Sequence, residues 1–81
     1  MSAAQLDPRL VGEVIASFRR KKGLTQEVLS GLADLGRTHL SAIEHGERKP
    51  TLETLYRLSG ALEVPMWVIV KKIEEELEAR G

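Results

Sequence analysis

The sequence contains no cysteine, and it has one tryptophan, one tyrosine and one phenylalanine in 81 residues. Without cysteine the chain has neither disulfides nor thiolate metal sites, so packed apolar side chains must stabilise the fold. No apolar run approaches the roughly 20 residues that cross a bilayer. The first residues, MSAAQLDPRL, lack the basic and apolar regions of a signal peptide. These absences predict a cytoplasmic protein that has no membrane partner.

The chain also lacks an excess of either charge, since 12 basic residues balance 12 acidic ones. This balance argues against a general binder of polyanions. The distribution is uneven, because residues 1–50 hold eight basic and six acidic residues, whereas residues 51–81 hold four and six. The first half therefore has room for a basic face, although such an excess is more often a solvated surface.

Apolar residues recur at helical spacing along the whole chain, which predicts an all-α protein of five helices and no strand. Asp7, Thr25 and Thr51 are good N-caps for three of the helices, and Pro65 suits the start of the last. Glycines 23 and 46 are expected stops. The inward side is expected to include Leu10, Val14, Phe18, Leu29, Leu32, Ala33, Leu40, Ile43, Leu52, Leu55, Leu58 and Leu62.

The segment LTQEVLSGLADLGRTHLSAIEHG, residues 24–46, reads as two short helices joined only by ADLG. The second of these helices is expected to start near Gly36 or Arg37 and to reach His45. So short a connection predicts a rigid pair that presents one helix outward. The side chains on that helix should then indicate what it contacts.

The last helix, predicted within residues 65–80, carries an apolar stripe that is wider than one small core requires. Part of the stripe is therefore expected to face a second copy of the chain, since symmetric dimers are the commonest oligomers. The alternative is that Trp67 and Val70 cover the bundle. The expected dimer interface consists of Met66, Trp67, Ile69, Val70, Ile73 and Leu77.

The block from RRKKGLTQ to LEVP resembles the helix-turn-helix family of phage Cro and lambda repressors, the xenobiotic-response-element type. The shared motifs are GLTQ, RTHLS, IEHG and PTLETLYRLSGAL. Short chains with RTHLSAIEHGERKPT are similar to controller proteins of restriction-modification systems, which dimerise through the last helix. The resemblance implies a single five-helix, lambda-repressor-like DNA-binding domain over residues 1–81, with a central helix-turn-helix.

The same resemblance places four residues where the family reads base edges in the major groove, namely Arg37, Thr38, Ser41 and Ala42. An arginine can grip guanine O6 and N7 with two hydrogen bonds. Alternatively, Arg37 is an ordinary exposed arginine or contacts only phosphate. Thr38 can offer its methyl group to thymine or its hydroxyl to phosphate, whereas Ala42 offers only a methyl group.

Further residues match positions that contact the DNA backbone in the family. Gln26 takes the phosphate-binding position at the start of its helix, and Thr25 caps N–H groups that can face a phosphate. Arg48 and Lys49 would release counterions on binding, although Glu47 departs from the basic residue often found there. A solvated surface is the alternative for each. The expected backbone contacts are Thr25, Gln26, His39, His45, Arg48 and Lys49.

Two features of the resemblance concern structure rather than contact with DNA. Arg19 and Glu44 match an ion pair that joins the first and third helices in the family, so the pair is expected to set the pose of the reading helix. Asp34 stands where the family usually has a glycine in the tight turn. Glycine accepts a left-handed conformation without strain, and aspartate accepts it less readily.

An enzyme is the weaker interpretation, because only one cluster, around His39 and His45, could hold a metal. Six residues apart on a helix, these histidines point about 120° from each other and cannot share one metal ion. We therefore expect no catalytic residue, no metal and no cofactor.

The sequence as a whole predicts a homodimeric, sequence-specific transcriptional regulator that binds an inverted repeat in double-stranded DNA, with the controller role as one specific form. The main alternative is the antitoxin of a toxin–antitoxin pair, which binds a toxin protein and its own promoter. A module that uses the fold only for protein contacts is a third reading. RNA polymerase and a toxin protein stay open as further partners.

Overall fold

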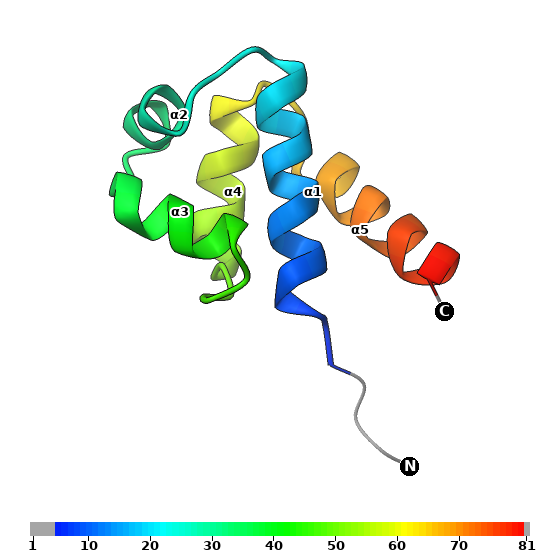
Figure 1. The fold of residues 1–81 in the computed structure, drawn as a ribbon. Helices are drawn as coiled ribbons and strands as arrows, with labels where there is room; N and C mark the ends of the chain where they lie inside the picture. Colours follow the sequence, from blue (N-terminus) through cyan, green and yellow to red (C-terminus); the bar gives the residue numbers. More distant parts are fainter. Residues whose placement is uncertain (1–4, 81) are drawn as a thin grey trace.

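A computed structural model describes residues 5–80 of the chain (Figure 1). Within that range the chain forms five helices and no strand, so the all-α prediction is confirmed. None of these helices is both long and apolar enough to cross a membrane. The helices are α1 (Pro8–Lys21), α2 (Gln26–Leu32), α3 (Arg37–Glu44), α4 (Leu52–Ala61) and α5 (Met66–Arg80).

The helix ends follow the local signals in the sequence. The side chains of Asp7, Thr25 and Thr51 each accept a hydrogen bond from a backbone N–H two or three residues later, at 2.9, 3.1 and 3.0 Å. Gly23 and Gly46 have positive φ angles of 73° and 78°, which a glycine adopts without steric cost. The caps and stops therefore fix the element boundaries close to where the sequence predicts them.

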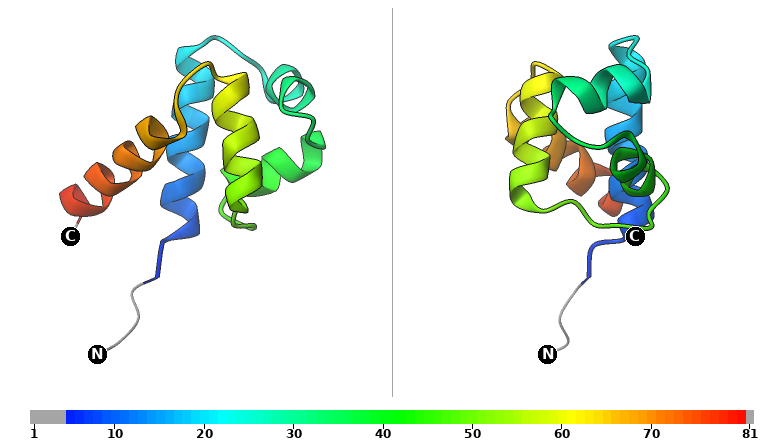
Figure 2. Two further views of the ribbon diagram at one scale, coloured as in Figure 1. Left: turned by 180° about the vertical axis from the view of Figure 1, so that it is seen from behind. Right: turned by 90° about the vertical axis from the view of Figure 1, so that its left-hand side faces the viewer.

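Helix α1 occupies the middle of the fold, with α2, α3 and α4 on one side of it and α5 on the other (Figures 1 and 2). It packs against α3 on one side and against α5 on the other. Helix α4 contacts both α2 and α5 and closes the bundle. The α2–α3 pair and α5 consequently lie on opposite sides of α1, so α3 and α5 are free to contact different partners.

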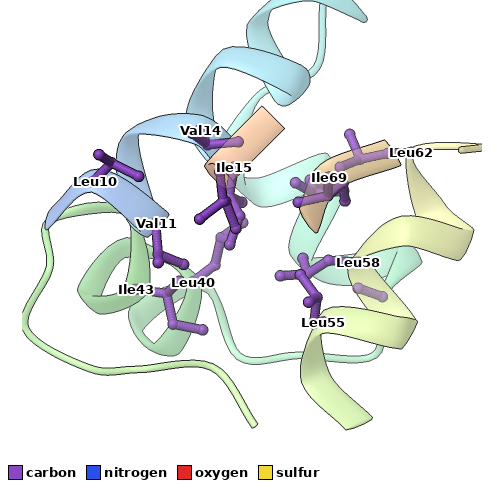
Figure 3. Packing of buried hydrophobic residues seen from close by; sticks show 13 residues of the cluster. Leu10, Val11, Val14, Ile15, Leu40, Ile43, Leu55, Leu58, Leu62 and Ile69 are labelled. Carbon is purple, nitrogen blue, oxygen red and sulfur yellow. The ribbon is translucent and has the colours of Figure 1, made fainter. Parts of the chain in front are cut away.

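The core lies where all five helices meet (Figure 3). Two residues predicted to face inward are exposed instead, because Leu32 is 62% and Leu52 is 72% accessible to solvent. Leu32 is the last residue of α2 and Leu52 the first of α4, where fewer neighbours cover a side chain. Those two predictions are wrong. The side chains with the least exposure are Leu10, Ile15, Leu29, Leu40, Ile43, Leu58, Leu62 and Ile69.

The apolar stripe on α5 is divided between the core and the solvent. Ile69 and Ile73 are buried within the single chain, at 0% and 5% exposure, so the core takes most of their surface and their place at a dimer interface stays a prediction. Met66 and Leu77 are partly buried and pack against the same core. Trp67 is 65% exposed and lies largely in solvent, and Val70 on the same flank is 39% exposed. Helical periodicity finds the stripe but does not show which half the core takes.

Helices α1 and α3 approach each other closely at Gly12. A Cβ atom at this position would lie 2.2 Å from the carbonyl oxygen of Ile43 and 2.6 Å from that of Glu44. Both distances are far below a van der Waals contact, so only glycine fits against the backbone of α3. This contact helps to position α3.

Candidate nucleic-acid interface

A buried ion pair connects α1 to the end of α3. The carboxylate of Glu44 accepts hydrogen bonds from Nε and Nη2 of Arg19 at 2.7 and 2.9 Å. It accepts a third from Nε2 of Gln26 at 2.9 Å, and Nη1 of Arg19 donates to the carbonyl oxygen of Leu24 at 2.9 Å. The two charged side chains are only 11% and 4% exposed. The sequence predicted this pair, and the structure adds Gln26 and the α1–α2 loop to it.

The hydrogen bonds keep both members of the pair charged. Burial alone would raise the pKa of the Glu44 carboxyl, but hydrogen bonds from Arg19 and Gln26 outweigh burial and bring it below its ordinary value. The hydrogen bond to Glu44 in turn raises the pKa of the Arg19 guanidinium. The pair therefore acts as a fixed structural joint at the base of α3 and is not available to read DNA.

The turn between α2 and α3 adopts the left-handed conformation with an aspartate. Asp34 has a φ angle of 53°. Its N–H donates to the carbonyl oxygen of Gly31 at 3.2 Å, and the N–H of Leu35 donates to that of Ser30 at 2.8 Å. Helices commonly end in this pair of hydrogen bonds. The turn forms without glycine, so α3 starts after only four residues.

The predicted reading residues gather on the side of α3 that faces away from the core. Leu40 and Ile43, on the inner side, are fully buried. On the outer side, the residues in the first turn of α3 are exposed and those in the second turn are half-buried. In Figure 1, α3 starts at the left edge of the molecule and crosses in front of the lower part of α4. The outer side carries Arg37, Thr38, Ser41 and Ala42.

His45 extends the same side of α3 by one turn, and a hydrogen bond orients its ring. Nδ1 lies 2.7 Å from the carbonyl oxygen of Ser41. A carbonyl oxygen can only accept, so Nδ1 carries the hydrogen and Nε2 of the neutral ring is an acceptor. A neutral His45 therefore cannot donate to a phosphate directly, and a contact between the two would run through a water that donates to both Nε2 and a phosphate oxygen. His39 is half-buried. No group of three potential ligands for a metal occurs in residues 5–80.

The residues predicted to bind phosphate at the start of α2 keep some donor capacity. The Thr25 hydroxyl uses its oxygen to accept from Val28 N–H, which leaves its hydrogen available. Gln26 donates one amide hydrogen to Glu44 and keeps the second. Gln26 can thus connect a phosphate to the ion pair that holds α3.

The loop after α3 carries exposed Arg48 and Lys49, and the fold brings a third cation to it. A Cβ atom at Gly46 would lie 2.6 Å from Cγ of Arg9, so the start of the Arg9 side chain packs against this loop. Arg9 is exposed in the first turn of α1. Arg9 lies far from this loop in the sequence, so a reading of the loop motif missed it. The glycine at position 46 is the one signal in the sequence for a close approach there.

An outward helix, a short turn from its neighbour and a buried joint at its base together define a helix-turn-helix DNA-binding domain. Residues 15–66 match the helix-turn-helix family, and the chain belongs to that family. It is a DNA-binding transcriptional regulator and not an enzyme.

Individual relatives agree with this class. The chain is 42% identical over 67 residues to the uncharacterized HTH-type transcriptional regulator y4dJ of Sinorhizobium fredii, covering 83% of this chain and 87% of that protein. It is 33% identical over 66 residues to control protein C.MunI of a Mycoplasma species, covering 80% and 89%.

The fold also matches solved structures of a restriction-modification controller protein. One is the C.Esp1396I tetramer in complex with its natural 35 base-pair operator, with a TM-score of 0.81 and 33% sequence identity. The match covers 90% of this chain and 96% of that one. The five-helix, lambda-repressor-like fold is thereby confirmed.

Proposed function

We propose that this protein is a homodimeric transcriptional regulator that recognises an inverted repeat by placing α3 of each copy in the major groove. The observation that carries the proposal is the outer side of α3, with Arg37 exposed at its start and a buried ion pair at its base. A fixed pose matters because hydrogen bonds to base edges require a defined register.

We assign the residues around α3 to two kinds of contact, those with base edges and those with the DNA backbone. Arg37 makes two hydrogen bonds to a guanine, and Thr38, Ser41 and Ala42 contact neighbouring bases in the same groove. The backbone contacts come from the start of α2 and from the loop after α3, and they set the position of the domain without reading sequence. They are Thr25, Gln26, His39, His45, Arg48 and Lys49, and we add Arg9 because the start of its side chain packs against the same loop.

The second copy is held through the outward flank of α5, where Trp67 and Val70 are 65% and 39% exposed. Because α5 lies on the opposite side of α1 from α3 (Figure 1), a dimer formed there leaves both reading helices free. A two-fold dimer of this kind requires half-sites about one helical turn apart, on the same side of the duplex. Residues 1–81 then act as one domain, with residues 65–80 as its dimerisation helix.

The specific role that we propose is control of a restriction-modification system. Its support is the likeness to C.MunI and to the operator-bound C.Esp1396I protein. A methyltransferase or endonuclease gene beside the gene for this chain would agree with the role.

Selection of bound duplexes from a random DNA pool tests the proposal. We expect an enriched inverted repeat, bound by two chains in native mass spectrometry. The control is Arg80→Ala, which removes an exposed arginine from the last turn of α5. Arg80 pairs with Glu13 of the same chain and lies off the flank that carries Trp67 and Val70, so this variant should enrich the same sequence. If no sequence is enriched and weak binding fades with salt for every duplex alike, the protein does not read bases and the proposal is wrong.

A further inference from the structure

A hollow of about 400 Å³ lies between the start of α1, the end of the α3–α4 loop, α4 and α5. Its walls are mainly apolar and include Leu6, Val11, Leu55 and Val70. Leu6 is 52% exposed although it lies against other apolar groups. The hollow thus presents an incompletely covered apolar surface on the side of the molecule that carries α5.

Trp67 is not among the residues that line this hollow, although it lies about one helical turn before Val70 on the wall. It is the only tryptophan of the chain, and the residue is 65% exposed. Val70, on the wall of the hollow, is three residues further along α5, so the two side chains lie on the same flank. One flank therefore carries both a large unburied ring and an unfilled apolar hollow.

We propose that Trp67 of each copy enters the hollow of the other copy in the dimer. This inference rests on the dimer of the proposed function and adds to it the side chain that anchors the interface. In a two-fold interface the same patch meets itself, so a projection needs a matching recess elsewhere on the patch. Trp67 and the hollow meet this requirement.

The positions along α5 agree with an antiparallel crossing of the two helices. If the two-fold axis passes at the level of Val70, Trp67 of one copy lies level with Ile73 of its partner, because both residues are three positions from Val70. Ile73 is at the edge of the hollow, together with Val70 and Glu74. The crossing therefore brings each indole ring to the mouth of the partner's hollow without any change in the fold.

The size and charge of the hollow agree with Trp67 of a second copy as its occupant. The hollow is at the lower end of the roughly 300–1,000 Å³ found for ligand pockets, which suits one aromatic ring better than an extended ligand. Its two charged lining residues, Lys49 and Glu74, have opposite signs, so two copies can meet without net repulsion. Tryptophan in a desolvated pocket is also a typical anchor of protein interfaces.

Fluorescence of the full chain tests this directly, because all tryptophan emission comes from Trp67. Sedimentation gives the fraction of dimer across a concentration series. We expect the emission to move to shorter wavelength, and quenching by acrylamide to fall, in step with the dimer fraction. This readout separates burial of Trp67 from dimer formation itself.

Two variants remove the ring and the hollow separately. Trp67→Ala deletes the ring, and Leu6→Arg places a charge in the hollow at an exposed position outside the helices. Each should weaken the dimer by about tenfold or more. A mixture of the two variants should dimerise better than either alone, because the heterodimer keeps one ring and one intact hollow. The control is Tyr56→Ala, which removes an aromatic ring of 67% exposure from α4 and should leave dimerisation unchanged.

The other outcomes distinguish this inference from the proposed function. A dimer in which acrylamide quenches Trp67 as strongly as in the monomer overturns the inference, and the hollow then takes another occupant, such as an apolar small molecule. Failure of the mixed variants to rescue each other also overturns it, while the dimer itself stands. A chain that stays monomeric at every concentration and on DNA overturns both.

Discussion

The guanidinium of Arg19, near the end of α1, holds the carboxylate of Glu44, at the end of α3, through hydrogen bonds of 2.7 and 2.9 Å. The two residues are far apart in sequence, and their side chains are almost completely buried. Gln26 at the start of α2 donates to the same carboxylate. One carboxylate therefore joins the three helices on which the position of the reading helix depends.

Removal of this carboxylate should destabilise the fold, because it leaves the Arg19 charge buried without a partner. For Glu44→Gln we expect a loss of about 3 kcal/mol in the free energy of unfolding, measured with urea. The control is Glu53→Gln, which breaks the exposed pair between Glu53 and Arg57 and should cost less than about 1 kcal/mol. Equal losses in the two variants would mean that burial adds nothing to the Arg19–Glu44 pair.

The same comparison should depend on pH. The pKa of Glu44 is lower in the folded chain than in the unfolded chain, so the unfolded state binds more protons as pH falls. The stability that the carboxylate provides is complete above its unfolded pKa of about 4.3 and is lost as pH falls through the folded value. Urea titrations of the wild type and Glu44→Gln should therefore converge in acid. A difference that stays constant with pH would show that the pKa is not lowered.

Gly12→Ala should disturb α3, since the added Cβ would meet the backbone carbonyls of Ile43 and Glu44. We expect a net loss of about 1–3 kcal/mol in unfolding free energy, although alanine is the better helix former. DNA affinity should fall even where the variant is fully folded. The control is Gly60→Ala in α4, where nothing lies within 4 Å of the new atom. That change should be neutral or stabilising, and a similar loss there would contradict the close-approach argument.

The cations around the α3–α4 loop should act through salt-dependent, sequence-independent binding. Arg48→Ala and Arg9→Ala should each lower the slope of log affinity against log salt by about 1. Both should weaken binding to operator and random duplexes to the same degree. Arg80→Ala, at the other side of the molecule, should leave the slope unchanged. If Arg9→Ala has no effect on the slope, Arg9 does not contact the DNA backbone, although its side chain packs against the loop.

Much of the fold could be predicted because its signals are local. An N-cap acts on N–H groups two or three residues away, so Asp7, Thr25 and Thr51 mark helix starts without knowledge of the tertiary fold. The apolar spacing likewise identified all five helices of residues 5–80. The ion pair was predictable only through the family resemblance, because no local pattern joins Arg19 to Glu44.

The remaining features depend on how the helices pack. Periodicity places Ile69 and Trp67 on nearly opposite sides of α5, but it does not show that the core takes the side of Ile69. It also does not show that α3 lies against Gly12, or that Arg9 reaches the loop at Gly46. These contacts join residues from separate helices, and only the assembled structure brings them together.

The most direct test of base reading by α3 is the affinity of the wild type and Arg37→Ala for two duplexes. One is the selected operator, and the other has the contacted guanine pair replaced in each half-site. We predict that Arg37→Ala weakens binding to the operator by about 1–3 kcal/mol for each half-site, which is about 5- to 150-fold for each half-site. The variant should also bind the two duplexes equally well. If Arg37→Ala keeps the wild-type affinity and the wild-type preference for guanine, α3 does not read the operator through Arg37, and the account is contradicted.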